Sequence, residues 1–307
     1  MVHQKTRSRQ TIVKCQQSNT IFLALLCIFL ITIVLAIYVI IKANLDQKNV
    51  INEFNEIIVE KQEPDIQAID FQSVVDEWTS SVAGEKSVII YDLDLNKMVG
   101  SYNTTKNYNT ASLYKLFVVY EGYRKLETGE WKEDELVGST GYTILECLDK
   151  SIRESYSPCA EALWAKIGHD ELDEIIEKDF KITNSEISSL ISNPEDVLKI
   201  MKMFYRHSDI KSENYLAVLK DSFLNQPKTT YDWRQGLPSG FSDNAKVYNK
   251  VGWEYNESGY WNIYHDTAIV EFPEKNRHFI VIVMTNRVPF QKIRELGSEI
   301  EKEFNKY

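Results

Sequence analysis

Runs of apolar residues predict two groups of β-strands separated by a helical region. The first group lies at 87–103, where two apolar stretches flank a polar turn at 94–97. The second comprises strand-like stretches at 245–253, 260–273 and 277–287. Strands at both ends of a domain with helices between them indicate an α/β fold of the α+β type. In this fold an antiparallel sheet is flanked by helices and interrupted by a helical insertion.

Apolar residues at helical spacing predict the helices. One helix at 70–84 precedes the first strands, and an amphipathic helix closes the chain at 288–307. The helix predicted at 112–130 is too rich in apolar residues for a surface, so we expect it to be buried on most sides. Most of 131–223 also reads as helical.

One segment near the N-terminus, 21–41, is uncharged and long enough to cross a bilayer as a helix. Four basic residues and no acidic one precede it, which predicts a cytoplasmic N-terminus. The apolar run is longer than that of a cleavable signal peptide and does not end in small residues, which favours a retained signal anchor. Cys27 lies early in this run, whereas a lipid-modified cysteine would end it. The sequence therefore predicts a cytoplasmic tail, a transmembrane segment, a stalk and one domain outside the membrane: 1–20, 21–41, 42–67 and 68–307.

The predicted exported part is acidic and contains two cysteines. All 45 acidic residues follow Lys42, together with 30 of the 35 basic ones, so this part carries a net charge of about −15. Such a charge argues against nucleic acid or an anionic surface as a partner. Cys147 and Cys159 are far enough apart to form a disulfide if the chain turns between them. The alternative is two small buried apolar residues.

The stretch "ASLYKLFVV" places a nucleophile and a base on one helical face. Ser112 stands where a polar approach becomes the buried helix, and free N–H groups at a helix N-terminus suit a developing oxyanion. Lys115 is one turn further along, and burial in so apolar a helix favours its neutral amine. The alternative is a helix-capping serine with a lysine that extends into solvent. A second Ser-x-x-Lys match, Ser208–Lys211, lies in a polar run and lacks this setting.

This stretch, following a predicted two-stranded hairpin, resembles the S-x-x-K motif of the penicillin-recognising serine hydrolases. That superfamily includes class A β-lactamases and D,D-peptidases, and it carries two further elements, S-D-N and K-T-G. The resemblance covers about 68–307 and implies a β-lactamase/transpeptidase-like fold that uses no cofactor. It also implies that Ser112 is the nucleophile and that Lys115 is its base.

The second element resembles "SIRESYSPCAEALWAKIG", in which Ser155 and Ser157 occupy the first and third motif positions. The resemblance implies that Ser155 shuttles the proton of the leaving group. Ser157 replaces an asparagine whose amide usually contacts substrate and the catalytic lysine. A literal Ser-Asp-Asn at Ser242–Asn244 lies in a loop before a late strand, and we interpret it as a coincidence.

The third element resembles Lys250-Val251-Gly252 on the strand predicted at 245–253, whereas Lys166–Gly168 matches the letters inside a helix. The resemblance implies that Lys250 holds a substrate carboxylate and that Gly252 leaves room for the substrate backbone. Val251 replaces a hydroxyl residue that usually helps to bind this carboxylate.

Three residues complete the comparison with this element. The N–H of Trp253 would be the second oxyanion donor beside that of Ser112. Asp266 matches a buried structural aspartate, and neighbouring His265 is assigned no role beyond that of an ordinary surface or core histidine.

A class A β-lactamase also needs a glutamate that activates water for deacylation. Glu186 in "KITNSEISSL" is the available candidate, but the usual E-x-x-L-N run is missing, so we interpret it as a solvated loop residue. The sequence therefore predicts an extracytoplasmic serine hydrolase, anchored in the bacterial cell membrane, which is acylated by β-lactams or peptidoglycan stem peptides. The alternative is a binding or structural protein that kept the fold and lost efficient turnover, as Ser157 and Val251 would permit.

Overall fold

The computed structural model describes residues 67–228, 231–255 and 261–307, with a few positions between 35 and 42. Residues Ile66–Tyr307 form one unit by their internal contacts. The predicted tail, transmembrane segment and stalk lie almost entirely outside the described residues. No helix in the part of the chain that the structure describes combines the length and the apolar composition that a membrane span needs.

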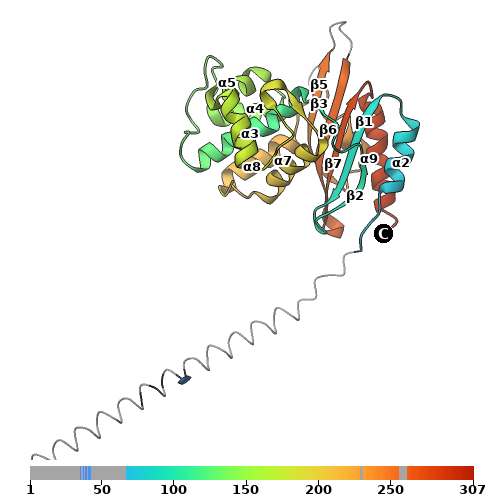
Figure 1. The fold of residues 1–307 in the computed structure, drawn as a ribbon, viewed down its shortest axis with the longest axis horizontal. Coiled ribbons are helices and arrows are strands. Elements are labelled where there is room, and N and C mark those ends of the chain that lie inside the picture. Colours follow the sequence, from blue (N-terminus) through green and yellow to red (C-terminus); the bar gives the residue numbers. More distant parts are fainter. Residues whose placement is uncertain are drawn as a thin grey trace, which may run out of the picture. The chain divides into compact units, whose positions relative to one another are not determined.

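The domain is built on an antiparallel sheet whose strands come from both ends of the domain (Figure 1). The order across the sheet is β2-β1-β7-β6-β5, which places β5 at an edge. Each neighbouring pair is antiparallel, and this confirms the predicted sheet with its helical insertion. The strands are β1 (Glu85–Asp92), β2 (Lys97–Tyr102), β5 (Lys246–Tyr255), β6 (Trp261–Phe272) and β7 (Arg277–Asn286).

Helices cover both faces of this sheet. The first and last helices of the domain, α2 (Gln72–Ser81) and α9 (Phe290–Phe304), lie against one face, and the helical insertion lies on the other side (Figure 1). A short pair of strands joins the segment before the insertion to the segment before α7: β3 (Tyr108–Asn109) and β4 (Ile191–Ser192). The helices of the insertion are α3 (Tyr114–Glu127), α4 (Ile144–Arg153), α5 (Ser157–Ile167), α6 (His169–Lys178), α7 (Pro194–Arg206) and α8 (Glu213–Leu224).

Two hydrophobic cores sandwich the sheet, which explains why its central strands read as continuous apolar runs. On β1, Ile89 and Tyr91 belong to the core shared with the insertion, whereas Val88 and Ile90 belong to the core shared with α2 and α9. Successive side chains of a strand point to opposite faces, so a strand covered on both sides needs apolar residues at every position.

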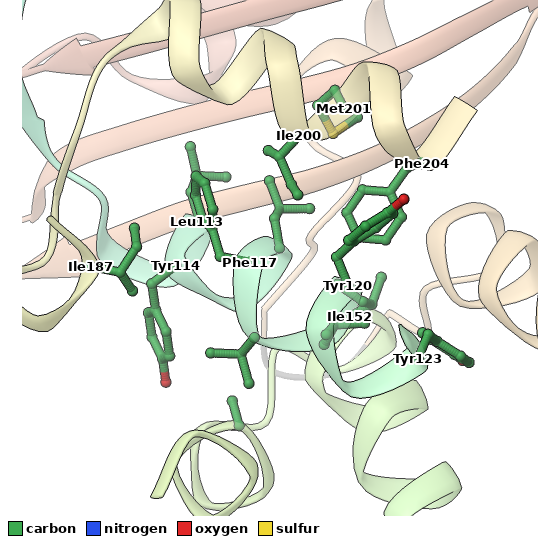
Figure 2. Close-up of a cluster of buried hydrophobic side chains, with 14 of the residues drawn as sticks. Leu113, Tyr114, Phe117, Tyr120, Tyr123, Ile152, Ile187, Ile200, Met201 and Phe204 are labelled. Carbon is green, nitrogen blue, oxygen red and sulfur yellow. The ribbon is translucent and has the colours of Figure 1, made fainter. Parts of the chain in front are cut away.

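Helix α3 runs through the middle of the insertion, as its composition predicts. Five consecutive residues, Leu116 to Tyr120, have no exposed area. Figure 2 shows Phe117 and Tyr120 of this helix beside Ile200 and Phe204 of α7. Full burial of one such side chain contributes about 1.5–3 kcal/mol, so this packing fixes the helix that carries the candidate base.

The structure corrects the boundaries of two predicted helices. The first ends at Ser81 rather than Gly84, because Gly84 adopts a φ of +102° where the chain turns into β1. A Cβ atom there would lie 2.7 Å from the carbonyl oxygen of Asn286 on β7. The buried helix begins at Tyr114 rather than Ser112, because Ser112 lies in a separate 3-10 turn, Ala111–Leu113.

Candidate active site

Ser112 is held in a tight turn immediately before α3. The preceding residue, Ala111, has a φ of +42°, a left-handed conformation that residues other than glycine rarely adopt. Asn109 supports this turn, because its Oδ1 accepts a hydrogen bond from Ala111 N at 2.7 Å. Strained backbone of this kind persists only where the surrounding contacts hold it, and it is common at functional sites.

Lys115 lies in the first turn of α3 and contacts Ser112. Its Nζ lies 3.0 Å from Ser112 Oγ, and its side chain has no exposed area. The cap positions of the 3-10 turn and of α3 are Thr110 and Leu113, and neither forms a side-chain cap. The structure therefore excludes the alternative of a capping serine beside a lysine that extends into solvent.

The loop between α4 and α5 brings two further hydroxyls to Lys115. The lysine Nζ donates to the backbone oxygen of Ser155 at 2.6 Å and lies 3.3 Å from Ser155 Oγ. It also lies 3.0 Å from Ser157 Oγ, so this hydroxyl contacts the lysine at the position where the sequence comparison expects an asparagine amide. Ser155 itself has a φ of +53°, a second left-handed residue at this site.

Lys250 on β5 approaches the same serine from the opposite side. Its Nζ donates to Ser155 Oγ at 2.9 Å and to the backbone oxygen of Val251 at 2.7 Å. The side chain of Lys250 is fully buried, so its amine lies beneath Ser155 rather than at the surface. Val251 is also buried, in the core shared with α2 and α9.

Gly252 allows the turn that carries Ser112 to approach β5 closely. A Cβ atom at this position would lie 2.7 Å from the backbone oxygen of Thr110 and 3.0 Å from the side chain of Leu113. The sequence comparison expected this space to receive the substrate backbone. The structure shows that the absence of a side chain also lets the turn that holds Ser112 pack against the strand.

Trp253 lies on β5, the edge strand of the sheet. Three alternate carbonyls of this strand accept hydrogen bonds from side chains rather than from β6: those of Val247, Asn249 and Val251. In an antiparallel strand the N–H and C=O of one residue point to the same side, and this direction alternates along the strand. Trp253 continues the series, so its N–H points to the same edge as the Val251 carbonyl that Lys250 contacts.

Burial shifts the ionisation of both lysines. It lowers the pKa of Lys115 to about 7, while the nearby charge of Glu161 on α5 acts in the opposite direction. Burial also lowers the pKa of Lys250 well below its usual value, and the charge of Lys115 adds to this shift. A substantial fraction of Lys115 is therefore neutral near pH 7, the form that can accept a proton from Ser112.

Asp266 lies beneath the site on β6 and connects three parts of the fold. Its Oδ1 accepts a hydrogen bond from the side chain of Asn249 at 3.0 Å, and its Oδ2 accepts one from Leu237 N at 2.7 Å. Burial raises the pKa of this carboxyl to about 7. These contacts agree with the structural aspartate that the sequence predicted.

The remaining sequence matches pair with residues outside this cluster. Glu186 is exposed, and its backbone pairs with Ile191 in a small turn. The literal Ser-Asp-Asn begins at Ser242, whose Oγ donates to Glu301 on α9 at 2.6 Å. Lys166 of the helical Lys-Ile-Gly match is exposed and pairs with a glutamate on the surface.

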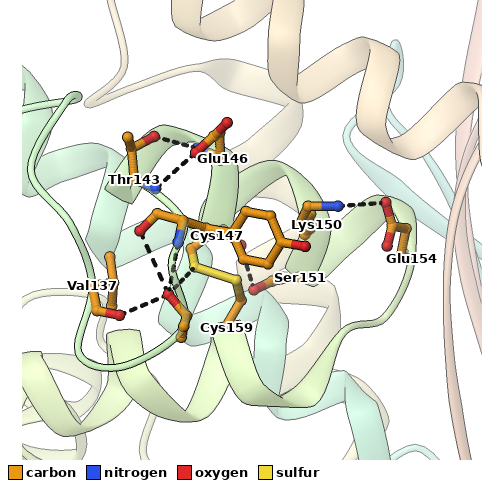
Figure 3. The surroundings of a disulfide bond; sticks show 10 residues. Val137, Thr143, Glu146, Cys147, Lys150, Ser151, Glu154 and Cys159 are labelled. Atoms are coloured by element: carbon orange, nitrogen blue, oxygen red, sulfur yellow. Dashed lines mark hydrogen bonds and ion pairs between the residues drawn. A yellow bond between two sulfur atoms is a disulfide. The ribbon is translucent and has the colours of Figure 1, made fainter.

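A disulfide joins the two helices that flank the Ser155 loop. Figure 3 shows Cys147 of α4 bonded to Cys159 of α5. Their Cα atoms are 4.9 Å apart. Both cysteines are fully buried. Because the bond closes a loop that contains Ser155 and Ser157, it ties together the two ends of the segment that supplies these hydroxyls.

Comparisons with known proteins agree with this architecture. Three similar solved structures are the TLA-1 extended-spectrum β-lactamase (17% identity, TM-score 0.64, covering 76% of this chain and 98% of that one), a class A β-lactamase from Bacteroides cellulosilyticus (15%, 0.65, 78% and 100%) and PBP-A (15%, 0.63, 79% and 100%). At these identities the likeness concerns the fold. No curated protein matches the sequence significantly. The family model described as "Beta-lactamase enzyme family" matches residues 70–304, so this chain belongs to that family of serine hydrolases, within the penicillin-recognising superfamily.

Proposed function

We propose that this protein forms an acyl-enzyme at Ser112 with β-lactams or cell-wall peptides. The observation that supports this most strongly is the contact at 3.0 Å between Ser112 Oγ and the Nζ of Lys115, a lysine whose side chain has no exposed area. A nucleophilic hydroxyl needs a neutral base within hydrogen-bonding reach, and burial supplies that base by lowering the pKa of Lys115 to about 7.

In the first step the neutral amine of Lys115 takes the hydroxyl proton of Ser112 while Oγ attacks the carbonyl carbon. The carbonyl oxygen gains the negative charge, and the N–H groups of Ser112 and Trp253 are the donors we assign to it. Preorganised donors of this kind contribute about 10²–10³-fold to the rate. The edge direction of the Trp253 N–H supports this assignment.

In the second step the tetrahedral intermediate collapses, the bond from carbon to the leaving nitrogen breaks, and that nitrogen needs a proton. Ser155 Oγ is the donor we propose, because both lysine amines lie beside it, at 3.3 Å for Lys115 and 2.9 Å for Lys250. The proton first taken from Ser112 then returns through Lys115 to Ser155. The products are the ester at Ser112 and the released amine, which in a β-lactam stays attached to the acyl group.

The same geometry supports slow release of the acyl group. Deacylation needs a base aimed at a water molecule, and Glu186, the carboxylate that the sequence offers for this purpose, is exposed. We therefore propose a protein that is acylated readily and hydrolyses its acyl-enzyme slowly. We retain the proposal that the uncharged segment 21–41 anchors the domain on the outer side of the bacterial cell membrane.

Labelling with a fluorescent penicillin tests the acylation directly. The wild-type protein should acquire covalent label, and Ser112→Ala should acquire none while keeping the thermal stability of a folded domain. Absence of label on folded wild-type protein would instead favour a binding or structural protein that kept the fold without its chemistry.

A further inference from the structure

His265 is a buried histidine that connects the sheet to the segment before Ser112. It lies on β6 opposite Gly252 of β5 and has no exposed area. One ring nitrogen, Nε2, lies 2.8 Å from the backbone oxygen of Asn109, and the other, Nδ1, lies 2.9 Å from the backbone nitrogen of Thr285 on β7. The ring therefore bridges β7 and β3.

The two contacts fix the tautomer of this ring. The backbone N–H of Thr285 can only donate, so Nδ1 must accept. The proton of the neutral ring then lies on Nε2, which donates to the carbonyl of Asn109. Burial lowers the pKa of His265 to about 4, so the ring keeps this neutral form near pH 7.

The carbonyl that His265 binds lies at the start of the strained turn. Asn109 precedes Ala111, whose φ is +42°, and its side chain accepts the hydrogen bond of Ala111 N. The only residue between them, Thr110, donates its backbone N–H to Leu190 O at 2.7 Å. Asn109, Thr110 and Ala111 are thus each held by a separate hydrogen bond, and the bond to Asn109 comes from His265 of the central sheet.

We propose that His265 is a positioning residue, which holds the turn at 109–112 against the sheet so that Ser112 Oγ stays within reach of Lys115. This inference rests on the proposed acylation of Ser112. Without the imidazole, the Asn109 carbonyl would lose its buried donor and the strained turn would lose its link to β6. A displacement of about 1 Å at a reacting group can reduce a rate by about 10²-fold.

Two substitutions separate the two contacts of the ring. His265→Gln carries its amide nitrogen at about the reach of Nε2, so it keeps a donor for Asn109 and loses the acceptor for Thr285. His265→Asn keeps an acceptor near Thr285 and is too short for Asn109. We expect His265→Asn to lower the acylation rate constant by about 10–100-fold with little change in the dissociation constant of the preceding non-covalent complex. His265→Gln should retain most of the rate.

The control is His278→Asn, which removes another sheet histidine, one whose Nδ1 contacts Asp94 at 2.8 Å. It should leave the acylation rate unchanged. Equal losses of rate in His265→Gln and His265→Asn, or losses that follow the melting temperature in all three variants, would overturn the proposal.

Amide hydrogen exchange decides the positioning role without relying on acylation. In His265→Asn the amides at 108–113 should exchange faster, whereas in His265→Gln the Thr285 amide should exchange faster and 108–113 should stay protected. Fast exchange at 108–113 in His265→Gln would contradict the proposal. This outcome needs only the glutamine variant, so the test holds even if His265→Asn does not fold. Should no penicillin acylate the wild-type protein, the proposed function would fail and this measurement would still test the positioning.

Discussion

Lys115 and Lys250 bring their amines to one hydroxyl, Ser155 Oγ, at 3.3 and 2.9 Å. The two lysines come from opposite sides of the site, one from the central helix α3 and the other from the edge strand β5. Two ammonium groups this close repel each other, and both are buried. The arrangement therefore opposes simultaneous protonation, and the charge of Lys115 helps to lower the pKa of Lys250.

The first prediction concerns the pH dependence of acylation. The reactive form of Lys115 is the neutral amine, and its pKa is about 7. The acylation rate should rise about tenfold per pH unit below this value and level off above it. Glu161→Gln should move the midpoint to lower pH, because the Glu161 charge raises the pKa of Lys115. A rate measured by penicillin labelling from pH 5 to 9 checks both; a flat profile would exclude Lys115 as the titrating base.

The second prediction separates the assigned motif residues from the literal Ser-Asp-Asn. Ser155→Ala and Lys250→Ala should each lower the acylation rate by about 10²-fold or more, the usual scale for proton transfer and electrostatic stabilisation. Ser242→Ala is the matched control, since its hydroxyl contacts Glu301 on α9, and it should leave the rate unchanged. The opposite ranking would overturn the assignment of the second and third elements.

Much of the fold follows from local sequence patterns, and the reasons are visible in particular elements. The sheet is predictable because β1 and β7 are covered on both faces and need apolar residues throughout. The buried helix is predictable because its composition excludes a surface. The exact start of that helix is not, since the left-handed Ala111 depends on contacts from Asn109 and from distant parts of the chain.

The same distinction holds for the candidate site. Ser112 and Lys115 are three residues apart on one chain segment, so spacing alone brings them together. The contacts of His265 with Asn109 and Thr285 join residues distant in sequence, and no spacing rule predicts them. Glu161 could have been found from the sequence in two steps. Ser157 was expected beside Lys115, and Glu161 lies four residues after Ser157 on α5, which is about one helical turn. Helical spacing therefore places its charge on the side of α5 that carries Ser157.

A third prediction concerns the disulfide. Replacing both Cys147 and Cys159 by serine should lower the free energy of unfolding by about 3 kcal/mol, the scale for opening a cross-linked loop of roughly this length. Denaturant unfolding of the variant and of oxidised wild-type protein measures the difference. Alkylation followed by mass analysis, without reductant, is the complementary test, and two modified thiols in the folded exported protein would show that the bond does not form there.

A fourth prediction concerns topology. The uncharged segment 21–41 follows four basic residues, so the domain at 68–307 should lie outside the cell membrane. Protease should be added to cells whose cell membrane is intact and whose outer layers let the protease through. It should digest the domain and spare a cytoplasmic control protein. Protection of the domain until the membrane is lysed would reverse the predicted orientation.

The fifth prediction concerns slow deacylation and is tested by the mass of the intact protein after mixing with a penicillin. We expect one adduct with the full mass of the penicillin, located on Ser112, which forms in a stoichiometric burst and persists for many minutes. Loss of one general base costs about 10²–10⁴-fold, which is why deacylation should be slow. Ser112→Ala should form no adduct, and Glu186→Gln should behave like the wild type. Rapid hydrolysis of the penicillin without accumulation of the adduct, abolished in Glu186→Gln, would exclude slow deacylation and identify a working β-lactamase.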